Sequence, residues 1–124
     1  MLNNLVLVGR VVETPTVKHS ENGLVYTLIT LAVMRPFKNS DGKYESDFIG
    51  CLVWDALASS TCEYCKKGDM IGIRGRLTSR QKDIVFNSEK EEHVKRIQNL
   101  EVIAERVFFL NVSGNKKEEI PVVE

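Results

Sequence analysis

The sequence has no excess of either charge. Its 17 Lys and Arg residues equal its 17 Asp and Glu residues, so the formal net charge is zero with His neutral. A protein that binds polyanions through bulk charge alone is therefore excluded. If the chain binds nucleic acid, its cations must be segregated along the chain, or stacking on aromatic side chains must supply much of the affinity.

Other features are missing as well. No apolar run approaches the roughly 18 residues of a membrane span, and the N-terminus lacks the basic start and apolar centre of a signal peptide. The three cysteines are an odd number at irregular spacing, which argues against a disulfide framework. We therefore expect a cytoplasmic protein with reduced thiols and no membrane segment.

Motifs of common enzymes are absent. The sequence has no Gly-rich phosphate loop, nucleophile elbow or histidine–carboxylate signature, so no residue is a candidate for catalysis and no cofactor is expected. Cys62 and Cys65 form one C-x-x-C pair, which is compatible with a thiol oxidoreductase or with metal binding. A structural zinc site needs four ligands, however, and this pair supplies two. We expect both thiols to pack as small apolar side chains on a helix.

The chain of 124 residues, 43% of them hydrophobic, suits one folded domain. Hydrophobic patterning predicts five strands, at residues 5–12, 24–33, 47–54, 70–80 and 100–110. The first two strands carry apolar residues at both alternating positions, which is typical of strands buried on both faces. Gly9 indicates a bulge or tight bend in the first strand, and Arg35-Pro36 is expected to end the second.

One helix is predicted after the third strand. Apolar residues recur at three- and four-residue steps between residues 57 and 65. Asp55 is the expected N-cap, Lys66 and Lys67 would place positive charge in the last turn, and Gly68 would end the helix.

The connections complete an all-β architecture. Residues 39–42 predict a turn between two strands, and residues 84–98 predict a protruding hairpin between the fourth and fifth strands. One short helix between strands three and four of a five-stranded protein is the layout of a closed Greek-key barrel, the OB-fold. We expect this domain to span residues 1–110 and a short flexible tail to span residues 111–124.

Seven short segments occur in an order and spacing typical of one family. They lie at residues 4–10, 30–37, 47–49, 51–54, 66–69, 75–77 and 101–105. Together they closely resemble bacterial-type single-stranded-DNA-binding proteins over about residues 3–110. The resemblance implies an OB-fold that binds single-stranded DNA in replication, recombination and repair. It also implies a homotetramer built from two dimers, and no enzymatic activity.

Aromatic side chains are the first candidates for DNA contact. A binder that tolerates any sequence needs rings that stack on bases and cations that follow phosphates. Phe48 and Trp54 have the same parity on the third strand, so both rings can project from one face. Parity alone leaves open that both are core residues, and the resemblance favours stacking. Phe37 occupies the family's other stacking position, with a buried loop anchor as the alternative.

Cations are the second group of candidates. Residues 35–82 hold nine Lys and Arg against six acids, a balance of +3, whereas residues 83–105 hold three against six, a balance of −3. Charge is therefore segregated along the chain. A solvated side chain is the alternative for each cation. Those expected along the DNA path are Arg35, Lys38, Lys67, Arg80 and Lys82.

Arg74 and Arg76 alternate outward on the fourth strand. The resemblance places the contact between two dimers on this face, where two arginines could pair with acids or oppose assembly. Arg76 is also a candidate DNA contact.

The chain departs from the family pattern in three places. Gln81-Lys82 stands where relatives often have an aromatic residue, so Phe86 could take over stacking or could instead pin the hairpin to the barrel. The hairpin is longer than usual and acidic, at Glu89, Glu91 and Glu92. The C-terminal residues 118–124 lack the family's terminal Phe, which argues against recruitment of the usual replication and repair partners.

The neutral charge also keeps a primosome-type or protein-interaction OB subunit as an alternative function.

Overall fold

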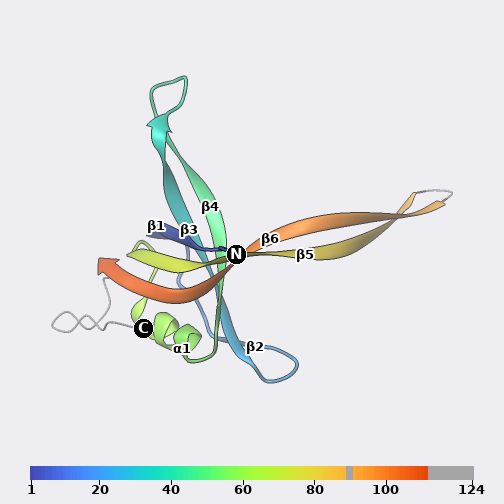
Figure 1. Cartoon of the computed structure of the whole chain (residues 1–124), viewed down its shortest axis with the longest axis horizontal. Helices are drawn as coiled ribbons and strands as arrows, with labels where there is room; N and C mark the ends of the chain where they lie inside the picture. Colours follow the sequence, from blue (N-terminus) through green and yellow to red (C-terminus); the bar gives the residue numbers. More distant parts are fainter. Residues whose placement is uncertain (89–90, 112–124) are drawn as a thin grey trace.

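The computed structural model of the chain describes residues 1–88 and 91–111. These residues form six strands and one helix (Figure 1). The elements are β1 (Leu5–Val11), β2 (Lys18–His19), β3 (Val25–Lys38), β4 (Tyr44–Trp54), α1 (Asp55–Tyr64), β5 (Met70–Ser88) and β6 (Glu91–Asn111). The expected flexible tail lies outside the described residues from residue 112 onward.

Five of the strands close into a barrel. The sheet order is β1-β5-β6-β4-β3-β2, and an additional pairing of β1 with β3 joins the two sides. Only β4 and β6 pair in parallel among the described strands; the other pairs are antiparallel. The helix follows β4, at the place in the chain where one helix was expected. This arrangement confirms the OB-fold, with the two-residue β2 as an addition that the sequence did not predict.

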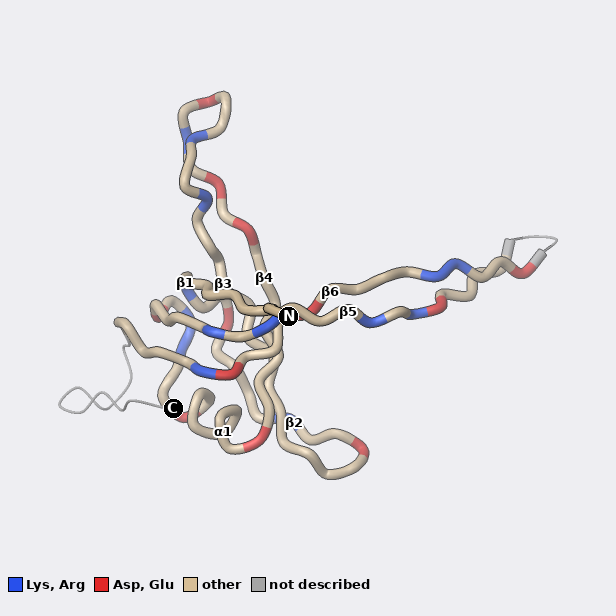
Figure 2. The backbone as a smooth tube through the Cα atoms, viewed as in Figure 1, with Lys and Arg blue, Asp and Glu red and all other residues tan. Residues whose placement is uncertain are grey.

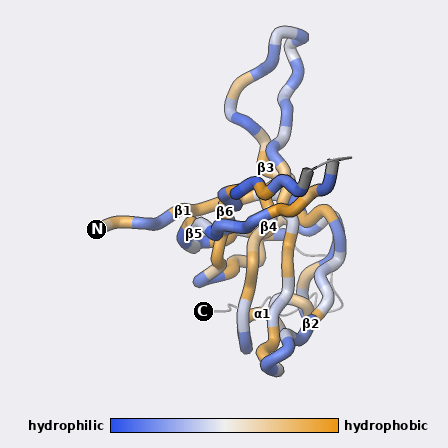
Figure 3. The backbone as a smooth tube through the Cα atoms, turned by 90° about the vertical axis from the view of Figure 1, so that its right-hand side faces the viewer, coloured by the Kyte–Doolittle hydropathy of each residue, from blue (hydrophilic) through white to orange (hydrophobic). Residues whose placement is uncertain are grey.

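The barrel interior is built from alternate residues of its strands. Ile29, Leu31, Val53, Ile71 and Ile73 are fully buried there. Figure 3 shows hydrophobic residues concentrated along the barrel strands. Among the described residues, no helix is long and apolar enough to cross a membrane.

The prediction that the first two strands are buried on both faces was wrong. Val6, Val8 and Leu28 are 62%, 47% and 52% exposed. A barrel strand has only one inner face, and α1 packs on β3, β4 and β6 at one place rather than around the barrel. The outer face therefore carries exposed apolar side chains, which can mark a binding surface.

Gly9 lies where β1 crosses β3 to close the barrel. A Cβ atom at this position would lie 2.5 Å from the carbonyl oxygen of Ala32. The absence of a side chain allows this close approach, as the glycine inside the predicted strand indicated.

Two strand pairs continue beyond the barrel as arms (Figure 1). We call residues 34–46 the β3–β4 arm and residues 78–101 the β5–β6 arm. The prediction that Arg35-Pro36 ends the strand was wrong, because β3 runs on to Lys38. The pairing with β4 shifts register between Met34 and Lys38, and such an irregularity accommodates a proline that cannot donate a ladder hydrogen bond. The turn at residues 39–42 and the protruding hairpin are both present.

The helix ends differ from those expected. Asp55 is the first helical residue rather than the N-cap, and Trp54 at the N-cap position makes no side-chain capping hydrogen bond. Lys66 and Lys67 lie beyond the helix, which ends at Tyr64. The backbone N–H of Lys66 instead donates to a carboxylate oxygen of Asp69 at 2.8 Å, within the turn that leads to β5.

Candidate nucleic-acid interface

Even-numbered side chains of β3 and β4 share the outer face of the barrel. The register places Tyr26 opposite Trp54, Leu28 opposite Leu52 and Ala32 opposite Phe48. Phe48 is 70% exposed, so it is not a core residue. We call this outer face the stacking surface and define it by Tyr26, Leu28, Met34, Phe48, Leu52 and Trp54.

Phe48 and Trp54 lie at separate points along this surface. Six residues of strand separate them, which corresponds to about 20 Å at the usual rise per residue. The two rings can therefore contact different bases of one strand rather than sandwich a single base.

Trp54 is half-buried against a second aromatic ring. The centroids of Trp54 and Tyr26 are 5.3 Å apart, with an interplanar angle of 41°. Both rings line an open pocket together with Arg80 and Glu101. The sequence analysis missed Tyr26, although its parity with Leu28 and its position across the hairpin from Trp54 could have indicated it. An aromatic pair beside a guanidinium is suited to hold a base and its phosphate.

The β5–β6 arm carries cations and an aromatic pair on one face. The register places Ile84 opposite Lys95 and Phe86 opposite His93, with Arg80 and Lys82 at alternate positions of the same face. The rings of Phe86 and His93 stack with centroids 5.5 Å apart and an interplanar angle of 29°. We call this the basic face: Arg80, Lys82, Ile84, Phe86, His93, Lys95 and Ile97.

The basic face includes residues that sequence reasoning missed. Lys95 and His93 become candidates only once the cross-strand register is known. Phe86 is 49% exposed and stacks on its own arm, which does not favour its alternative role as a pin to the barrel. Of the three acids expected at the tip, Glu92 is exposed, whereas the side chains of Glu89 and Glu91 lie outside the described set.

Several of the expected cations are paired within the chain. Arg80 lies 3.6 Å from Glu101, and Arg76 lies 3.9 Å from Glu105 on the outer face of the barrel. Figure 2 shows Lys and Arg interspersed with Asp and Glu on both arms. These pairs reduce the charge available to phosphates, as expected for a chain of zero net charge.

Arg35 is the most tightly held of these cations. Its guanidinium donates two hydrogen bonds to Asp47, at 2.7 and 3.0 Å, and one to Glu45 at 3.1 Å. The hydrogen bond with Asp47 raises the pKa of Arg35, and the same bond lowers the pKa of Asp47. Neighbouring residues of a strand point to opposite faces, so Asp47 and Phe48 lie on different faces of β4. Because Arg35 is paired with Asp47, the structure does not bring Arg35 to the stacking surface.

The three remaining candidates are dispersed. Phe37 is 62% exposed on the β3–β4 arm, so it is not a buried loop anchor. The ammonium group of Lys38 lies 5.8 Å from the ring centroid of Tyr44 near the same tip. Lys67 lies in the turn after α1, where its backbone N–H donates to the hydroxyl oxygen of Thr14 at 3.0 Å. Among the described residues, no hydrogen bond or ion pair joins Lys67 to the stacking surface.

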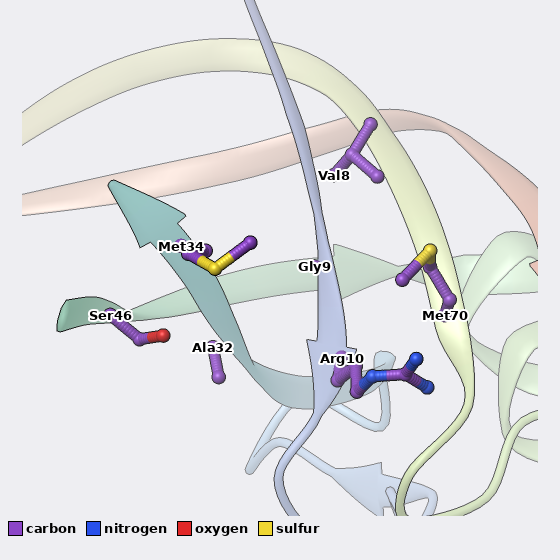
Figure 4. A pocket seen from close by; sticks show the side chains of 7 residues that line it. All are labelled: Val8, Gly9, Arg10, Ala32, Met34, Ser46 and Met70. Carbon is purple, nitrogen blue, oxygen red and sulfur yellow. The ribbon is translucent and has the colours of Figure 1, made fainter. Parts of the chain in front are cut away.

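A second open pocket lies beside the crossing of β1 and β3 (Figure 4). Val8, Ala32, Met34 and Met70 make most of its lining apolar. The guanidinium of Arg10 at its rim donates to the carbonyl oxygen of Gly68 at 3.0 Å. Met34 belongs to both the pocket and the stacking surface, so the two are continuous.

The cysteines are arranged for packing. Cys51 and Cys65 belong to the buried core, and Cys62 is half-buried. Within the described ranges, no group of three or more His, Cys, Asp or Glu side chains could hold a metal ion. Burial raises the pKa of Cys51 to about 11 and the pKa of Cys65 to about 12, because desolvation disfavours the thiolate.

This burial predicts slow thiol chemistry. At pH 8, iodoacetamide should label Cys51 and Cys65 only after denaturation, because the thiolate is the nucleophile. The unfolded chain ionises these thiols above their ordinary pKa of 9.0, whereas the folded chain keeps them protonated to higher pH. The free energy of unfolding should therefore fall as the pH rises from 9 to 12. Mass spectrometry of labelled peptides tests the first expectation. Rapid labelling of Cys65 in the folded protein would support the oxidoreductase alternative instead.

The sequence model of the single-strand binding protein family matches residues 2–110. The chain belongs to this family. Its members are non-catalytic DNA-binding proteins, as the resemblance implied.

Individual members of the family show the extent of the similarity. A single-stranded DNA-binding protein of Halalkalibacterium halodurans is 41% identical over 118 residues, which are 95% of this chain and 66% of that protein. Single-stranded DNA-binding protein B of Bacillus subtilis is 35% identical over 117 residues, which are 94% of this chain and 97% of that protein. The chain thus spans about two thirds of the first relative and nearly all of the second.

A solved structure supports the fold. The structure described as a Plasmodium falciparum SSB complex with ssDNA superposes with a TM-score of 0.68 at 22% sequence identity. The match covers 90% of this chain and 97% of that chain. The shared fold therefore includes nearly the whole described barrel.

Proposed function

We propose that the chain is a sequence-tolerant single-stranded-DNA-binding protein that acts in replication, recombination and repair. The observation that carries the proposal is the stacking surface, where Phe48 and Trp54 share the outer face of β4 and Arg80 lies beside Trp54. Single strands expose base faces that such rings can stack on, whereas the bases of a duplex are stacked on one another. The names of the bacterial relatives support the same ligand.

The proposed binding path runs from the stacking surface onto the basic face. Bases stack first on Phe48 and on the Trp54–Tyr26 pair. Arg80 lies at the junction, and Lys82 and Lys95 continue the cationic line along the arm. Phe37 and Lys38 contribute from the β3–β4 arm, whereas the paired Arg35 and Arg76 and the distant Lys67 contribute less.

A homotetramer assembled from two dimers completes the proposal. Val6 and Val8 are exposed and apolar on β1, and the register places Val6 opposite Arg74 on β5. Arg76 on the same outer face lies near Glu105 of its own chain, which lessens repulsion between arginines when copies meet. Native mass spectrometry of the protein checks this assembly.

A titration of labelled oligo-dT followed by anisotropy tests the proposed function. We expect binding to the single strand and little binding to a duplex of equal length. The log–log salt slope should be about −3 or shallower, since each neutralised phosphate of a single strand contributes about −0.7 and the proposed path holds four cations, Lys38, Arg80, Lys82 and Lys95. Equal affinity for both forms, or a much steeper slope, would show that charge rather than stacking drives binding.

A further inference from the structure

The open pocket of the stacking surface has a polar side as well as an aromatic side. Its lining residues are Ser20, Tyr26, Leu52, Trp54, Arg80 and Glu101. The parallel register of β4 with β6 places Ile103 beside Leu52, so strand alternation brings Glu101 to the same outer face of the barrel. An acid is unexpected in a pocket for nucleic acid, because a carboxylate repels the phosphates that the neighbouring arginine attracts.

The carboxylate of Glu101 is accessible to a ligand. The side chain is 30% exposed, and its Oε1 atom lies 3.6 Å from the Nε atom of Arg80. That distance marks an ion pair rather than a hydrogen bond. The hydroxyl of Thr78 donates to the backbone carbonyl of Glu101, and among the described residues no donor forms a hydrogen bond with the carboxylate. Both carboxylate oxygens therefore keep the capacity to accept hydrogen bonds from a bound base.

A carboxylate distinguishes bases by the donors on their Watson–Crick edges. Guanine presents two adjacent donors, N1–H and N2–H, which match the two oxygens of a carboxylate. Cytosine and adenine each present one amino group next to an acceptor. Thymine presents a single N–H between two carbonyl oxygens, which a carboxylate repels. These edges are free in a single strand, so a pocket beside a stacking ring can read them.

We infer that this pocket selects guanine and disfavours thymine. The guanine ring stacks on Trp54, its N1–H and N2–H groups donate to the Glu101 carboxylate, and the guanidinium of Arg80 donates to O6. The ion pair engages Nε of Arg80, so its Nη groups can make that contact. The inference rests on the proposed function, because it assigns a base preference to one position of the proposed path. Other bases still stack on Trp54 with lower affinity, so the chain binds strands of any sequence.

A different role for Glu101 would be to position Arg80 without contacting a base. Removal of the carboxylate would then change the affinity for every strand by the same factor. Selection of a base instead changes the ratio of the affinities for two strands that differ at one base. This ratio therefore separates a specificity-determining residue from a positioning residue.

Three oligonucleotides test the selection with the wild-type chain. Each is an oligo-dT whose central position holds guanine, hypoxanthine or thymine. Hypoxanthine keeps the N1–H and O6 groups of guanine but lacks the N2 amino group, so it controls for the stronger stacking of a purine. We expect the guanine strand to bind about fivefold more tightly than either other strand, as a bidentate contact to a base provides. Equal affinities for the three strands would overturn the inference and leave the proposed function standing, whereas no binding to any strand would refute both.

Glu101→Gln tests whether this residue makes the selection. The amide replaces one acceptor by a donor, so it cannot accept from both N–H groups of guanine but can pair with thymine. Once circular dichroism shows that the variant is folded, we expect its affinities for the three strands to agree within about twofold. Glu105→Gln is the matched control, since Glu105 lies on the same strand, 3.9 Å from Arg76 and outside the pocket. Glu105→Gln should keep the preference for guanine. Its loss in Glu105→Gln, or its persistence in Glu101→Gln, would contradict the role of Glu101.

Discussion

The variant Phe48→Ala with Trp54→Ala should bind oligo-dT at least about 30-fold more weakly than the wild-type chain. Stacking contributes about 1–3 kcal/mol per base, and these rings lie far enough apart to contact different bases. Anisotropy titrations at constant salt measure the loss. Circular dichroism before and after heating shows whether the variant is folded, since Trp54 also packs on Tyr26.

A control separates stacking from the loss of exposed apolar surface. Val17 is 42% exposed and lies outside the stacking surface, so Val17→Ala should leave oligo-dT affinity within about twofold. If the folded aromatic variant binds as tightly as the wild type, stacking is not the mechanism. The alternative of a protein-interaction OB subunit would then be favoured.

The substitution Gly75→Ala should have the largest effect on stability. A Cβ atom at Gly75 would lie 2.1 Å from the carbonyl oxygen of Ile103, where β5 and β6 shift register. Because that atom belongs to the backbone, the two strands must separate, and we expect a loss of about 3 kcal/mol or more in the free energy of unfolding. For a domain of this size the melting temperature should fall by about 10 °C or more.

Gly50 offers a matched control on the barrel. The nearest atom to a Cβ built there is a methyl group of Leu28 at 3.7 Å, which is ordinary contact. Gly50→Ala should therefore leave the melting temperature within a few degrees, since alanine also restricts the unfolded chain. Equal effects of the two substitutions would mean that the close approach at Gly75 does not constrain the barrel.

The sequence predicted the barrel well because its strands follow simple rules. Inward residues such as Ile29, Val53 and Ile73 alternate with outward ones, and the helix has its own period. The pattern could not tell an exposed apolar face from a buried one, so Val6 and Leu28 were placed in the interior. Hydrophobicity reports that a side chain avoids water, but not whether another element covers it.

The sequence predicted only those parts of the candidate site that lie on a single strand. The parity of Phe48 and Trp54 follows from β4 alone. Tyr26, Lys95 and His93 join the site through cross-strand register, which local patterning does not specify. The pairing of Arg35 with Asp47 likewise depends on how β3 passes Pro36, and counting charges along the chain could not reveal it.

Trp54 fluorescence during an oligo-dT titration tests the stacking surface most directly. Trp54 is the only tryptophan in the chain, so its emission reports one position in the proposed path. We expect oligo-dT to quench the emission and the quenching to saturate at the same ratio of DNA to protein as the anisotropy. Duplex DNA should leave the emission nearly unchanged. Full binding by anisotropy with unchanged Trp54 emission would contradict the account, because it would place the DNA elsewhere on the molecule.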